Sequence, residues 1–124
     1  MAKKVINITL KTGDEALSNK LLGVVMDDYI KYRENNILVV IKILKDSVLI
    51  TRNNDEYQLN LVFKNKTNTK GKYILKENNY NFDLDIYTYI LNISNNEIKI
   101  KYKLNDEIRT FTLNIEEWLI WLIS

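Results

Sequence analysis

Apolar and polar residues alternate along most of the chain, in short segments separated by turns rich in Asn, Asp and Lys. An alternation with a period of two places successive side chains on opposite faces of an extended strand, so it predicts β-strands. The pattern predicts strands at about residues 3–10, 20–26, 28–34, 37–44, 47–52, 57–64, 70–76, 80–93, 97–104 and 108–115. The chain has no proline, the residue that most strongly interrupts a β-ladder.

The turns between these segments are short. Asn35-Asn36, Lys45-Asp46 and Asn95-Asn96 each separate two strands, and Asn and Asp tolerate the positive φ that tight hairpin turns need. Many short antiparallel strands joined in this way predict a meander, and closing a meander into a barrel removes its exposed edges. We therefore expect one all-β domain over residues 1–124, with a barrel over residues 3–115 and an apolar tail at 116–124. The barrel should be antiparallel and up-and-down, with about 8–10 strands.

Two-residue turns also determine which residues face each other across the sheet. The first two turns give these pairs: Glu34 with Ile37, Tyr32 with Val39, Ile30 with Ile41, Ile43 with Val48, Ile41 with Ile50, and Val39 with Arg52. The isoleucines and valines of this set form one apolar face that should line the core. Tyr32, Glu34 and Arg52 lie on the same face, all at one end of it.

The segment 80–93 changes parity along its length. Phe82, Leu84 and Ile86 are apolar on one parity, whereas Leu91 and Ile93 are apolar on the other. A β-bulge near residues 87–90 would reconcile the two, and bulges are common where barrels bend. The turn at Asn95-Asn96 then pairs Ile93 with Ile98, Leu91 with Ile100, and Tyr89 with Tyr102.

A polar cluster is expected at one mouth of the barrel. Arg109 shares the inward parity of its strand, and in an up-and-down meander it lies at the same rim as Glu34 and Arg52. The mouth should therefore contain Tyr32, Glu34, Arg52, Tyr57 and Arg109. The arginines could bind an anionic head group, or Glu34 could form a structural ion pair with one of them. The interior below should contain Ile30, Val39, Ile41, Ile50, Phe82, Thr88, Tyr102 and Phe111.

Several short motifs, taken in order, resemble a known family. They are Tyr32-x-Glu34, Val48-Leu-Ile-Thr-Arg52, Leu61-x-Phe63, Tyr73, Phe82-x-Leu84-x-Ile86-x-Thr88 and Tyr102-x-Leu104. Together they resemble the YwiB-like family of bacterial β-barrel proteins, a domain of unknown function, over about residues 3–114. The resemblance implies a barrel of calycin (lipocalin-like) type in a cytoplasmic bacterial protein, and it implies no activity. Asn53 and Asn78-Asn79 stand where the family leads us to expect glycine, and Asn tolerates the same backbone conformation.

Composition excludes most catalytic chemistry. The 124 residues include no His and no Cys, so His-based and thiolate nucleophiles and the usual zinc sites are absent. Three scattered glycines give no phosphate-binding loop. We therefore expect a non-enzyme with no catalytic residue, no cofactor and no metal.

Charge and hydropathy limit the expected partners and location. A net charge of +2 gives no field that would call for nucleic acid or a membrane surface as a partner. No secretory signal and no apolar run of about 18 residues is visible, which with the lack of Cys favours the cytoplasm.

Two charged stripes have plain explanations. Asp83 and Asp85 lie opposite in parity to the apolar residues of their segment, so they should face solvent rather than form an acid–base pair. Lys99, Lys101 and Lys103 could follow a phosphate backbone, but Tyr102 between them should point into the core. A solvated face is the better interpretation for both.

Two functional hypotheses lead, ahead of a third in which a carboxylate-based enzyme would need Asp83, Asp85 or Glu34 in a cleft. In the first, the barrel binds a small amphipathic or anionic ligand without catalysis; Arg52 and Arg109 hold its head group, and Glu34 and Tyr32 orient them. In the second, the barrel is filled by its own side chains and acts through a homodimer or partner surface. The tail residues Trp118–Ile123 could cap one barrel end as a short helix or form a dimer contact, and a strand or docking on a membrane surface are less favoured alternatives. The size of the barrel interior separates the two hypotheses.

Overall fold

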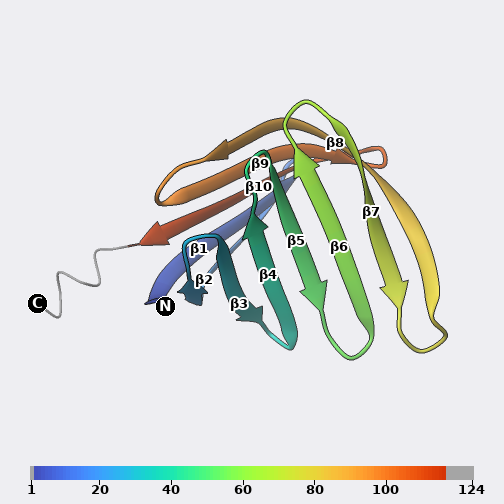
Figure 1. Ribbon diagram of the computed structural model, residues 1–124, viewed down its shortest axis with the longest axis horizontal. Coiled ribbons are helices and arrows are strands. Elements are labelled where there is room, and N and C mark those ends of the chain that lie inside the picture. Colours follow the sequence, from blue (N-terminus) through green and yellow to red (C-terminus); the bar gives the residue numbers. More distant parts are fainter. Residues whose placement is uncertain (1, 117–124) are drawn as a thin grey trace, which may run out of the picture.

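The computed structural model describes residues 2–116, which form β-strands and no helix (Figure 1). The strands are β1 (Ala2–Thr12), β2 (Glu15–Val25), β3 (Tyr29–Glu34), β4 (Ile37–Ile43), β5 (Ser47–Asn53), β6 (Tyr57–Lys64), β7 (Asn68–Leu75), β8 (Tyr80–Ile93), β9 (Glu97–Leu104) and β10 (Glu107–Glu116). Each strand pairs antiparallel with its neighbours in sequence, and β1 also pairs with β10, so the sheet closes. The predicted up-and-down barrel is confirmed, with ten strands.

β2 departs most from the prediction, because it begins at Glu15 instead of near residue 20. Residues 15–20 are exposed on both faces of the strand. Because neither face needs apolar side chains, their sequence does not alternate between apolar and polar residues. Pairing with β1 holds them in the sheet, up to the pair Thr12 and Glu15. Gly13, at φ 60°, makes the tight turn that begins this hairpin.

The predicted registers hold on both sides of the first two turns. β3 and β4 pair Tyr32 with Val39, and β4 and β5 pair Val39 with Arg52, as expected. The bulge in β8 is also present, between Thr88 and Ile90. One expected pair is wrong: Thr88, not Tyr89, lies opposite Tyr102, because the bulge leaves Tyr89 as the extra residue.

The barrel interior is built from the inward-facing residues of all ten strands. Among the residues predicted to lie there, these are buried: Ile30, Val39, Ile41, Ile50, Thr88, Tyr102 and Phe111. Phe63 and Tyr102 meet edge to face, with ring centroids 4.7 Å apart. Such pairs add about 0.5–1.5 kcal/mol beyond the area that the rings bury.

Phe82 is the exception, and its expected place in the interior is wrong. Its side chain has the predicted inward parity, since it lies opposite Tyr73, but 42% of the residue is exposed. The cause is strand length. β9 ends at Leu104, which pairs with Ile86, so β8 residues 80–85 extend past the end of their neighbour. Phe82 therefore faces the open end of the barrel.

The predicted helix and the apolar run Trp118–Ile123 lie outside the described residues. Within residues 2–116 there is no helix long and apolar enough to cross a membrane.

Thr88 provides a test of the core. Its hydroxyl is fully buried and has no hydrogen-bond partner among residues 2–116, whereas the Thr69 hydroxyl donates to the Val62 carbonyl. Because an unsatisfied buried hydroxyl costs free energy, we expect Thr88→Val to raise the free energy of unfolding by about 1 kcal/mol. Thr69→Val removes an existing hydrogen bond and should lower the free energy of unfolding by a similar amount. Urea denaturation measures both, and a loss of stability in Thr88→Val would contradict the prediction.

Candidate functional site

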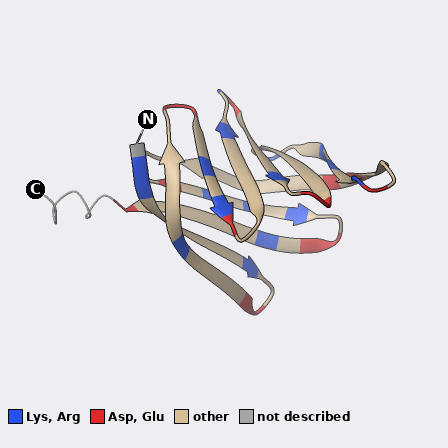
Figure 2. Ribbon diagram, turned by 90° about the horizontal axis from the view of Figure 1, so that it is seen from below, with Lys and Arg blue, Asp and Glu red and all other residues tan. Residues whose placement is uncertain are grey.

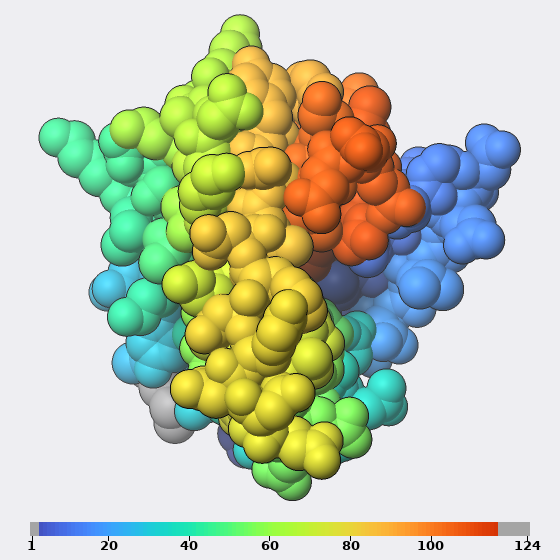
Figure 3. Space-filling view, turned by 90° about the vertical axis from the view of Figure 1, so that its right-hand side faces the viewer, coloured from blue at the N-terminus to red at the C-terminus, as the bar shows by residue number. Residues whose placement is uncertain are grey.

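The barrel encloses a cavity of about 550 Å³ that opens at one end. Its apolar wall includes Ile8, Leu10, Ile50, Leu61, Phe63 and Phe111, and its mouth carries Asn19, Tyr32, Glu34, Arg52, Tyr102 and Arg109. The volume lies within the range of about 300–1,000 Å³ that small-molecule sites occupy. In the space-filling view, a recess lies between the β7–β8 hairpin (yellow), the start of β10 (orange-red) and the β1–β2 hairpin (blue) (Figure 3).

The mouth lies where the register places it. β3 and β5 both end at this rim and β10 begins there, so Glu34, Arg52 and Arg109 come together around the same opening. Each has inward parity, because Glu34 pairs with Ile37, Arg52 with Val39, and Arg109 with Tyr102. The predicted convergence of three charged residues at one mouth is present in the structure.

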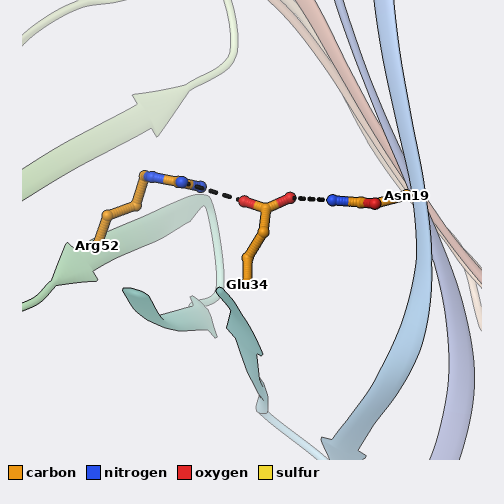
Figure 4. Close-up of polar contacts among 3 residues, drawn as sticks. All are labelled: Asn19, Glu34 and Arg52. Atoms are coloured by element: carbon orange, nitrogen blue, oxygen red, sulfur yellow. Dashed lines mark hydrogen bonds and ion pairs between the residues drawn. The ribbon is translucent and has the colours of Figure 1, made fainter. Parts of the chain in front are cut away.

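Glu34 joins two parts of the barrel (Figure 4). Arg52 Nη2 donates to Glu34 Oε1 at 3.0 Å, and Asn19 Nδ2 donates to Glu34 Oε2 at 3.0 Å. Backbone pairing between β2 and β3 covers only residues 23–25 and 30–32, so beyond that point the two strands are not linked by the ladder. The Asn19–Glu34 hydrogen bond therefore spans a gap in the barrel wall.

Partial burial makes this ion pair stronger than one on an open surface. The side chains of Arg52 and Glu34 are 29% and 20% exposed. Burial lowers the pKa of Arg52, but hydrogen bonds to Glu34 and Tyr57 and the charge of Glu34 outweigh it, so the pKa is raised overall. Arg52 is thus a permanent cation, fixed by an acid on the neighbouring hairpin.

Two tyrosines at the mouth stay neutral well into the alkaline range. Burial raises the pKa of the Tyr32 phenol, and the charge of Glu34 raises it further against a smaller opposing effect of Arg52. Burial also raises the pKa of Tyr102, against opposing effects of Arg109. Both phenols line the cavity, so both remain available there as hydrogen-bond donors.

Arg109 does not share Glu34 with Arg52. Its Nε and Nη2 atoms donate to Glu107 Oε1 at 2.7 and 2.6 Å, and both side chains are more exposed, at 33% and 50%. The predicted cluster thus resolves into two separate ion pairs. Glu107 could have been found, because it shares the inward parity of Arg109 two residues away. Asn19 could not, since its segment shows no strand pattern.

Tyr57 lies beside the cavity without lining it. Its ring stacks on Tyr73, with centroids 5.5 Å apart and planes 13° apart. Its side chain contributes to the electrostatic environment of Arg52, as described above.

The other sequence candidates lie outside the cavity. Asp83 and Asp85 are exposed and pair with Lys72 and Lys70, and Lys99 and Lys101 are exposed on the outer face. Figure 2 shows that residues of both signs are spread over the strands, without one dominant patch. Within residues 2–116, no three His, Cys, Asp or Glu side chains gather as metal ligands.

Comparison with known families supports the resemblance seen in the sequence. Residues 7–114 match the model of the family described as Domain of unknown function (DUF1934). The chain belongs to the DUF1934 family. Its fold is similar to that in the crystal structure of the ywiB protein from Bacillus subtilis, with a TM-score of 0.69 and 18% identity over 92% of each chain. At that identity the likeness establishes the fold of this DUF1934 protein and nothing further. The search of curated proteins gave no match.

Double-mutant cycles test the difference between the two ion pairs. For Glu34→Gln, Arg52→Gln and the double variant, we expect a coupling energy of about 1 kcal/mol, because both partners are largely shielded from water. For the corresponding Glu107 and Arg109 variants we expect less than about 0.5 kcal/mol, since exposed pairs contribute little. The measurement is the free energy of unfolding at low salt, and equal coupling in the two pairs would refute the distinction.

The tyrosines predict a pH dependence of stability. The unfolded chain releases the Tyr32 and Tyr102 protons near the ordinary value of 10.0, whereas the folded protein holds them to higher pH. Their effect is therefore absent below pH 10 and destabilises the folded state increasingly above it. Tyr32→Phe should make the decline shallower, as followed by thermal unfolding from pH 8 to 11. A decline of the same steepness in Tyr32→Phe would show that Tyr32 titrates normally.

Proposed function

We propose that this protein binds a small amphipathic, anionic ligand in its barrel, in the cytoplasm and without catalysing a reaction. The observation that carries the proposal is the cavity of about 550 Å³ with an apolar wall and two arginines at its mouth. A self-filled barrel would leave no such space, so the cavity favours binding over the interaction-protein alternative.

The depth of the cavity suits the apolar part of the ligand. Leu61 and Phe63 of β6 face Ile8 and Leu10 of β1 and Phe111 of β10 across the space. Each methylene transferred from water to such surroundings contributes about 0.8 kcal/mol. Resemblance to calycin-type barrels, which hold apolar or amphipathic ligands inside, supports this part of the proposal by analogy of fold alone.

The mouth suits a single negative charge. Arg109 also interacts with the Tyr102 phenol, but its ion-pair partner is the exposed Glu107, and it can exchange that acid for a ligand acid at little cost. Arg52 keeps Glu34, which also bonds Asn19, and offers its remaining N–H groups beside the neutral Tyr32 phenol. The head group would then lie between the two arginines, with Arg109 making the principal contact.

The distribution of acids supports a non-catalytic role. Without His or Cys, an enzyme here would depend on carboxylates, Lys, Tyr and Arg, and carboxylates are the usual acid–base groups among these. Glu34 is engaged by two hydrogen bonds, and Asp83 and Asp85 are on the solvent side. None of these three is placed as a general acid or base against a molecule in the cavity.

Ligand binding can be tested with decanoate and with decanol, which has the same chain length and no charge. We expect decanoate to raise the melting temperature in proportion to the logarithm of its concentration, and decanol to raise it less. Arg109→Gln should weaken decanoate binding about tenfold by losing a charge-assisted contact, whereas Lys99→Gln on the outer face should not.

Native mass spectrometry of protein purified from cells provides an independent measurement. A co-purified amphipathic molecule is the expected result. Protein free of any small molecule, together with no thermal shift from decanoate, would refute the proposed function.

A further inference from the structure

Four aromatic side chains form a continuous surface at the mouth, which we call the aromatic lip: Tyr57, Tyr73, Tyr80 and Phe82. Tyr57 stacks on Tyr73. The ring centroids of Tyr73 and Phe82 lie 5.9 Å apart, and Phe82 meets Tyr80 edge to face with ring centroids 4.8 Å apart. All four have the inward parity of their strands, since Tyr73 pairs with Leu59 and Phe82, and Leu75 pairs with Tyr57 and Tyr80. The lip therefore belongs to the inner side of the barrel.

The lip continues the wall of the cavity. Leu59 lines the cavity, and its neighbours across the sheet are Arg52 on one side and Tyr73 on the other. A molecule whose charged group lies at Arg52 is thus one strand away from Leu59 and two from Tyr73, about 10 Å in the sheet. That distance is within the span of a small molecule.

The outer half of the lip is uncovered. Phe82 is 42% exposed and Tyr80 is 55% exposed, although both point to the inner side. β9 ends at Leu104, opposite Ile86, so no described strand pairs with the free edge of β8 at residues 80–84. Phe82 and Tyr80 are in contact, so they form a contiguous apolar patch beside the cavity mouth, and such a patch is a candidate binding surface.

We propose that the aromatic lip is a second subsite of the cavity and receives a planar aromatic ring of the ligand. This inference rests on the proposed function and narrows its ligand class. The ligand has an apolar part in the barrel, a negative charge between the arginines, and a ring that stacks outside them. The lip itself carries no charge, so it recognises the ring by its face alone, and the exposed rings of Phe82 and Tyr80 are the ones open to it.

A structural role would predict something else. If the rings served only to hold the β7–β8 hairpin together, replacing one would change stability and leave the preference between ligands unaltered. The discriminating measurement is therefore the ratio of affinities for an aromatic and an aliphatic anion.

The test uses 8-anilinonaphthalene-1-sulfonate, an aromatic anion that offers a planar naphthalene ring and is followed by its fluorescence, and decanoate as the aliphatic competitor. We expect Phe82→Leu to weaken the aromatic probe about three- to tenfold and to leave decanoate affinity within about twofold of the native protein. Phe82→Tyr retains a ring and should retain binding. Tyr87→Leu is the matched control, because Tyr87 packs on Tyr89 on the outer face of the same strand.

The possible results separate the two proposals. Selective loss of the aromatic probe in Phe82→Leu supports the lip as a subsite. Equal weakening of both probes, no weakening of either, or the same loss in Tyr87→Leu overturns it while the cavity remains a binding site. If the native protein binds neither the aromatic probe nor decanoate, the lip and the proposed function are both overturned. If Phe82→Leu does not fold, Tyr80→Leu, with its more exposed ring, replaces it.

Discussion

β1 pairs with β10 on one side and with β2 on the other, and this double pairing closes the sheet on which the rest of the structure depends. In a closed sheet every inward position belongs to one shared interior, so parity along each strand decides what faces the cavity. Ile6 and Ile8 of β1 are buried for this reason, and they face residues that come from the far end of the chain. Closure also brings Arg109 to the same mouth as Arg52, although 57 positions separate them in the sequence.

The closure is weakest between β2 and β3. Only three residues of each strand pair there, although β3 continues to Glu34 and β2 begins at Glu15. Where the backbone hydrogen bonds between β2 and β3 stop, side chains link the two strands. Asn19, Glu34 and Arg52 form a chain of hydrogen bonds across the gap. Removing water from such a pair is costly, so its contribution to stability is small compared with the cost of leaving Arg52 without an acid. Glu34 is therefore better explained as a structural partner than as a reactive group.

Much of this could be predicted from local sequence. Two-residue turns rich in Asn and Asp determine register over a few pairs on either side, which is why the positions opposite Glu34, Tyr32 and Arg52 could be derived without coordinates. The parity change in β8 likewise required a bulge, although the residue it would insert could not be identified from the pattern. These features depend on neighbours close in the chain, and the alternation of apolar residues records them directly.

The features that could not be predicted depend on where strands end relative to one another. The alternation of apolar and polar residues does not record these end points. Phe82 has the parity of a core residue and is exposed only because β9 stops short of it. The early start of β2 is hidden because neither face of residues 15–20 is buried. The choice of acid for each arginine is also undetermined by parity, since Glu34 and Glu107 both face inward at the same rim.

That choice decides the chemistry of the mouth. Two arginines and two glutamates bring no net charge, so a bound anion adds an uncompensated negative charge unless a carboxylate gives way. Displacing Glu34 would leave Arg52 to the ligand but would also release Asn19 and open the gap between β2 and β3. Displacing Glu107 frees an exposed acid into water and disturbs no strand contact, so it costs much less. Under the proposed function the two pairs therefore have different roles: the shielded pair maintains the wall of the barrel, and the exposed pair is the one that a ligand would exchange.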